Sequence, residues 1–103
     1  MVDLARSVLV VVLIVQAGRG VASPLSNRLE AAARHCFESP DPARCDAVWD
    51  LSAELKEQAD SKDQFRCHTS ALTVEAMVSM ARQGVQDVPH QQAALEAMER
   101  DCP

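Results

Sequence analysis

From residue 25 onward, hydrophobic side chains recur at intervals of three and four residues, which is the spacing of one face of an α-helix. No stretch alternates apolar and polar residues in the way that a half-buried strand does. Ala, Leu, Glu, Gln and Arg, which favour helices, dominate this part of the chain. The pattern therefore predicts an all-α fold.

Four helices are expected, over residues 26–37, 42–60, 64–83 and 89–101. Residues 59–64 are polar and are expected to form a loop, although a helix that continues through them also fits the pattern. Gly84 is expected just beyond the end of the third helix, since glycine readily adopts the left-handed conformation found there. Pro89 is expected to open the fourth helix.

Capping residues and apolar stripes define these helices further. Ser26 or Asn27 can cap the first helix, and Asp41 followed by Pro42 is a strong start for the second. The expected core-facing positions are Leu25, Leu29, Ala32, Ala33, Cys36 and Phe37; Cys45, Val48, Trp49, Leu51, Ser52, Leu55 and Ala59; Phe65, Leu72, Ala76, Met77, Met80 and Ala81; and Ala94, Leu95, Met98 and Cys102.

The N-terminal segment has the order of a secretory signal. A short charged head precedes an apolar run, Val8 to Val15, and small residues follow it up to Ala22. We expect residues 1–22 to be a signal peptide, cleaved before Ser23, and residues 23–103 to form a single helical domain. An uncleaved membrane anchor and an ordinary buried helix are the alternatives, although the run is shorter than the roughly 20 residues of a membrane span.

Residues 23–103 are acidic. Removing Arg6, Arg19 and Asp3 from the total leaves 8 basic and 14 acidic residues, a net charge of −6 with histidine neutral. A chain of this charge repels nucleic acid and anionic lipid. We therefore expect no nucleic-acid partner, and no stable membrane span once the signal is removed.

Four cysteines, an even number in a short exported chain, indicate disulfides. Four cysteines allow three pairings, and helix geometry favours one of them. Cys36 and Cys45 flank the break around Pro40 to Pro42. Cys67 and Cys102 lie 18 and 17 residues from Val85, so the arms of a helical hairpin, each about 25–27 Å long, bring them together. The expected fold is a small bundle of two disulfide-closed hairpins, residues 26–62 and 64–102, with bridges Cys36–Cys45 and Cys67–Cys102.

The segment from Cys36 to Leu55 resembles the N-terminal half of the chloroplast-protein-twelve (CP-twelve) family. In that family a cysteine pair is followed, after three residues, by a Trp-Asp motif. Trp49, Asp50, Glu54 and Leu55 agree with the motif in residue and spacing. The positions that depart from it are Val48, Ser52 and Ala53. The resemblance covers about 30 residues, and the closely spaced second cysteine pair of the family is absent.

The resemblance implies a non-catalytic, redox-responsive protein-binding module. Its binding residues would be Trp49, Asp50, Glu54 and Leu55. By resemblance the partner would be phosphoribulokinase or glyceraldehyde-3-phosphate dehydrogenase, which conflicts with an export signal. The alternative is an exported structural or interaction protein of the cell envelope whose disulfides serve stability only. Without a functioning signal, the protein would be cytoplasmic.

Each of these features also has a plainer interpretation. Trp49 can belong to the core, and the acidic face of Asp50, Glu54 and Glu57 can be ordinary solvated surface. Met77, Met80 and Met98 can form an adaptable binding groove, but helical spacing favours core packing.

We expect no catalytic residues and no cofactor, because the sequence has no phosphate-binding glycine loop and no recurrent nucleophile signature. The adjacent pairs His35-Cys36 and Cys67-His68 offer zinc-type ligands. Neighbouring residues on a helix point about 100° apart and disulfides consume the thiols, so no metal site is expected.

Overall fold

The computed structural model describes residues 22–103, and within them it contains four α-helices and no strands. The helices are α2 (Pro24–Glu38), α3 (Pro42–Ser61), α4 (Phe65–Arg82) and α5 (Val88–Asp101). The all-α prediction is confirmed. The predicted signal peptide lies outside the described residues, apart from Ala22.

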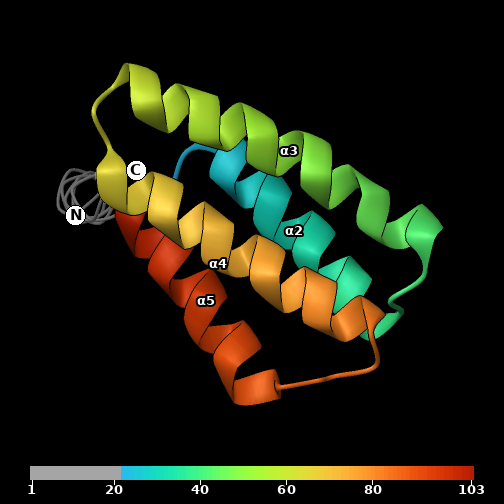
Figure 1. The fold of residues 1–103 in the computed structure, drawn as a ribbon. Helices are drawn as coiled ribbons and strands as arrows, with labels where there is room; N and C mark the ends of the chain where they lie inside the picture. Colours follow the sequence, from blue (N-terminus) through green and yellow to red (C-terminus); the bar gives the residue numbers. More distant parts are fainter. Residues whose placement is uncertain (1–21) are drawn as a thin grey trace, which may run out of the picture.

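Neighbouring helices in the sequence also pack against each other in space (Figure 1). α3 packs on α2 and on α4, and α4 packs on α5. α2 also touches α4 and α5 along the inner side of the bundle, while α3 and α5 do not pack against each other. α5 therefore depends for its position mainly on α4.

The core consists of small and branched apolar side chains. Its largest members are Leu29, Leu55, Leu95, Met98, Val48, Val74 and Val78, all at most 1% exposed. The four cysteines are equally buried. Disulfides thus occupy a large part of a core that holds no fully buried aromatic ring among the described residues.

Side-chain caps fix where the helices begin. α2 is capped by Ser23, whose hydroxyl accepts from the Ser26 N–H at 3.1 Å. The expected caps, Ser26 and Asn27, are wrong because Pro24 can already occupy the first helical turn, where its missing N–H is not needed. Asp41 caps α3 as predicted, accepting from the Arg44 N–H at 2.9 Å.

Two left-handed residues end α3 and α4. Gly84, at φ +88°, lies beyond α4 as predicted, and the N–H groups of Gly84 and Val85 donate to the carbonyls of Ala81 and Met80. Asp63, at φ +55°, ends α3 in the same way. A short break therefore separates α3 from α4, and the alternative of one continuous helix is wrong.

The core-facing side of α4 differs from the predicted one. Phe65 is 80% exposed and Leu72 is 46% exposed, and Ala76 is exposed as well. The buried side consists of Cys67, Ser70, Ala71, Val74, Val78 and Ala81. Apolar residues occur on every side of this helix, so its periodicity could not identify the inner face.

None of the helices formed by residues 22–103 has both the length and the hydrophobicity that a membrane span requires.

Candidate protein-binding surface

Both predicted disulfides are present. Cys36 joins Cys45 at the turn between α2 and α3, and Cys67 joins Cys102 at the opposite end of the bundle, between α4 and α5. No cysteine is free in the described part of the chain. Because each bridge joins consecutive helices, the two together brace both hairpins.

α3 carries the residues that the sequence singled out for binding. Its inner side is formed by Cys45, Val48, Ser52, Leu55 and Ala59. Asp50 and Glu54 are exposed on the other side, and Trp49 lies half-buried between the two. Leu55 is 1% exposed, so it supports α3 from the core and offers nothing to a partner.

Trp49 is accessible where α3 meets the last turns of α4. One part of the side chain packs against the core. Another part borders a shallow hollow that is also lined by Ser79, Arg82 and Gln83. The indole therefore combines an anchored ring with an open edge, and Arg82 places a positive charge beside it.

An acidic stripe runs along the exposed side of α3 next to Trp49. Its members are Asp46, Asp50, Glu54 and Glu57, all exposed. None of them forms an ion pair within residues 22–103. The spacing of four, four and three residues puts them on one side of the helix. Asp46 lay on this spacing but was missed, and Arg82 could not be found because it comes from another helix.

A second group of polar side chains lies between α3 and α4. The buried Ser52 hydroxyl donates to Glu75 Oε2 at 2.8 Å, and Lys56 Nζ lies 2.8 Å from the same oxygen. A serine beside a lysine and a glutamate resembles a catalytic group. Ser52 is 0% exposed, however, so this group acts as a tie between the helices.

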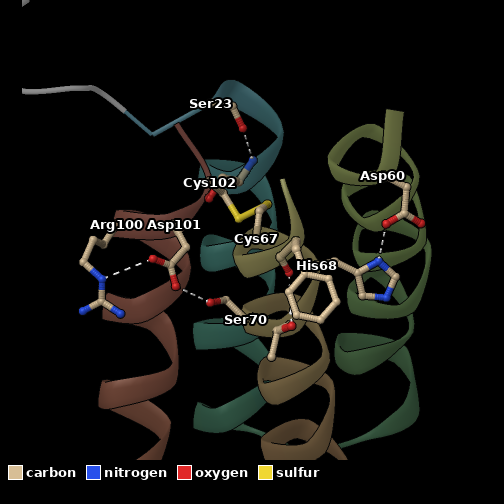
Figure 2. Close-up of a disulfide and its surroundings, with 11 residues drawn as sticks. Ser23, Asp60, Cys67, His68, Ser70, Arg100, Asp101 and Cys102 are labelled. Carbon is tan, nitrogen blue, oxygen red and sulfur yellow. Dashed lines mark hydrogen bonds and ion pairs between the residues drawn. A yellow bond between two sulfur atoms is a disulfide. The ribbon is translucent and has the colours of Figure 1, made fainter. Parts of the chain in front are cut away.

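Similar ties surround the Cys67–Cys102 bridge (Figure 2). Ser70 donates to Asp101 Oδ2 at 2.8 Å, and this hydrogen bond holds the pKa of the Asp101 carboxyl below its usual value. Since the folded-state pKa is lowered, the tie stabilises the fold above the unfolded pKa of about 3.9. Its contribution is lost as the pH falls through the lower folded-state value.

The start of α2 is tied to the end of α5 at the same place. The backbone N–H of Ser23 donates to the Cys102 carbonyl at 3.1 Å. On the other side of α4, His68 Nδ1 lies 2.7 Å from Asp60 Oδ1 (Figure 2). Residues near this bridge thus connect all four helices.

No group of three or more His, Cys, Asp or Glu side chains in residues 22–103 is arranged to hold a metal ion. The thiols of the two His-Cys pairs are both held in disulfides, at Cys36 and at Cys67.

Comparisons with protein-family models, with curated proteins and with solved structures found no match to this chain. The CP-twelve resemblance remains a prediction that rests on the motif residues of α2 and α3.

Proposed function

We propose that this protein is an exported, non-catalytic protein-binding module that engages its partner through the exposed side of α3. The observation that carries the proposal is the accessible edge of Trp49, next to a stripe of acidic side chains that form no ion pair within residues 22–103. Tryptophan is strongly enriched among the residues that dominate binding energy. A ring already anchored against the core loses little entropy on binding.

The charges on this side of α3 specify the kind of partner. Four acidic side chains favour a basic surface, and the complementary charges speed the encounter more than they add to the affinity. Apart from Trp49, the hollow is lined by Ser79, Arg82 and Gln83, so it suits a polar side chain that accepts hydrogen bonds. The partner is expected to present such a side chain within a surface rich in Lys or Arg.

The burial of both disulfides supports a stabilising role for them. All four cysteines are at most 1% exposed, whereas the disulfides that proteins use as switches are exposed or strained. The redox-responsive alternative rests on a different observation. Trp49 follows Cys45 by four residues, so reduction of Cys36–Cys45 would loosen the hairpin that holds the indole.

Trp49→Ala and Asp50→Ala are expected to weaken partner binding without unfolding the protein. Truncation of a central tryptophan should raise the dissociation constant by about 30-fold, and Asp50→Ala by a smaller factor. The measurement is photo-crosslinking of the oxidised protein to its partner in the producing cells, followed by titration of the purified partner. Purified phosphoribulokinase and glyceraldehyde-3-phosphate dehydrogenase are titrated in parallel.

Glu96→Ala is the matched control, because it removes an exposed carboxylate from α5, away from the proposed surface. It should leave the dissociation constant unchanged. Equal weakening by all three variants, or melting of the Trp49 and Asp50 variants at room temperature, would contradict the proposed surface. Tight binding of phosphoribulokinase or glyceraldehyde-3-phosphate dehydrogenase that is lost in reductant would favour the redox-responsive alternative.

Export is tested by the intact mass of the protein purified from the cells that produce it. We expect a chain that starts at Ser23 and lacks the four hydrogens removed by two disulfides. Reduction should restore those hydrogens. A full-length chain with free thiols would contradict export and point to the cytoplasm.

A further inference from the structure

The exposed side of α4 is apolar along most of its length. We define the α4 stripe as Phe65, Thr69, Leu72, Thr73 and Ala76, all of which are exposed. Phe65 and Leu72 are two of the large hydrophobic side chains that the bundle leaves in solvent. The stripe extends over 12 residues, so its ends are 11 steps, or about 16.5 Å, apart along the helix.

The two threonines make the stripe more apolar than their hydroxyls suggest. Thr69 Oγ1 donates to the Phe65 carbonyl at 3.1 Å, and Thr73 Oγ1 donates to the Thr69 carbonyl at 3.1 Å. Both hydroxyls are thus satisfied within the helix. The methyl groups remain available for packing. A partner that covers the stripe would therefore leave neither hydroxyl without a hydrogen bond.

The stripe also lacks charge, in a domain that is strongly acidic. Within the span of the stripe, the only Asp, Glu, Lys or Arg residues are Arg66, which is exposed next to Phe65, and Glu75, which is turned toward α3 by its bonds to Ser52 and Lys56. The other helices differ in this respect. Exposed acidic side chains occur on α2, on α3 and on α5, for example Glu38, Asp50 and Glu96.

Four of the five stripe residues are paired about one point, so the stripe can pack against itself; the counterpart of Thr73 is His68, outside the stripe. The midpoint between Phe65 and Ala76 is also the midpoint between Thr69 and Leu72. A two-fold axis at that point pairs antiparallel copies of α4. It sets the large Phe65 ring opposite the small Ala76 of the second copy and brings Thr69 and Leu72 together at the centre.

We propose that a second copy of this chain occupies the α4 stripe, in a two-fold symmetric dimer built on antiparallel α4 helices. Such an interface uses the same patch on both copies, which the large-to-small pairing allows. Each copy carries a net charge of −6 over residues 23–103, so two copies repel through most of their surface. The stripe itself carries no charged side chain, and the exposed carboxylates beside it, Asp60 and Asp63, lie only at its Phe65 end.

Other occupants fit the stripe less well. An anionic bilayer is repelled by the net charge of the domain. A strongly charged protein finds no counter-charge in the stripe, in contrast to the acidic side of α3. The stripe ends at Ala76, before Ser79 and Arg82 that border Trp49, so the dimer and the proposed partner surface share no residue.

The test is analytical ultracentrifugation of the oxidised protein, expressed from its full-length sequence and purified as it accumulates. We expect a dimer that dissociates in the micromolar range, because one helix stripe buries less than a standard interface. Leu72→Glu should raise the dissociation constant at least about tenfold. Raising the salt concentration from about 0.05 M to about 0.5 M should strengthen the wild-type dimer, since it screens the repulsion between the two copies.

Val88→Glu is the matched control, because Val88 is an equally apolar residue that is 64% exposed but lies on α5, beside a hollow between α2 and α5. It should leave the dissociation constant unchanged. Phe65→Glu repeats the test at the more exposed end of the stripe, should Leu72→Glu lose its helical circular dichroism. A wild-type protein that stays monomeric at about 500 µM overturns the proposal. So does a dimer that the stripe variants leave intact, or one that Val88→Glu disrupts.

Discussion

Replacing both Cys67 and Cys102 by alanine is expected to lower the free energy of unfolding by roughly 3.8 kcal/mol, on the chain-entropy estimate for a loop of this length. The loss is a large part of the roughly 5–15 kcal/mol that stabilises a typical domain. The measurement is urea denaturation followed by far-UV circular dichroism. The Cys36–Cys45 bridge closes a much shorter loop. Replacing both of its cysteines by alanine should therefore lower the free energy of unfolding by only roughly 2.7 kcal/mol.

The position of α5 explains why removing the Cys67–Cys102 bridge should affect more than the entropy of the unfolded chain. α5 packs mainly on α4, touches α2 less, and does not pack on α3. Its end is held by the bridge, by the Ser70–Asp101 hydrogen bond and by the Ser23–Cys102 hydrogen bond. We therefore expect residues 88–101 to lose their protection from hydrogen exchange first in the Cys67 and Cys102 variant. Equal stability of the two double variants, or unchanged protection of α5, would contradict this account.

Leu55→Ala is expected to lower the free energy of unfolding by about 2–5 kcal/mol, because it opens a cavity in a fully packed site. Leu55 is 1% exposed and belongs to the same core as Val48, Val74 and Leu95. The core contains few large side chains, so little can move to fill the space. Chemical denaturation measures the loss.

Glu54→Ala is the control for Leu55→Ala, since it changes the neighbouring residue on the exposed side of α3. Its effect on stability should stay within about 0.5 kcal/mol. In the partner-binding assay, with correctly folded protein, Glu54→Ala should weaken binding more than Leu55→Ala does. Glu54 belongs to the proposed surface, and Leu55 does not. A Leu55→Ala variant as stable as the wild type would show that Leu55 is not part of the core.

The local signals of this sequence determined the helices and the disulfides. Asp41 with Pro42 and the glycine at 84 mark helix ends through hydrogen bonds made within a few residues. The pairing of Cys67 with Cys102 followed from two helical arms of nearly equal length. Such features depend on neighbours along the chain, so they can be deduced without knowing the rest of the fold.

The apolar pattern of α4 did not identify its buried side, which the tertiary structure decided. The apolar residues of α4 are distributed over all of its sides, so several orientations of the helix would bury nearly the same amount of apolar surface. The orientation is set by partners on other helices. Cys67 must reach Cys102, Ser70 must reach Asp101, and Glu75 must reach Ser52. Meeting these three requirements turns Phe65 and Leu72 outward.

The same reason separates Leu55 from Trp49 in the candidate surface. Both residues match one linear motif, which records spacing along α3 but not what packs against it. α2 and α4 cover the side of α3 that carries Leu55 and leave an edge of Trp49 beside Arg82. The sequence therefore determined which residues share a helix. Only the packing of the neighbouring helices decided which of them a partner can reach, because burial depends on contacts between segments far apart in the chain.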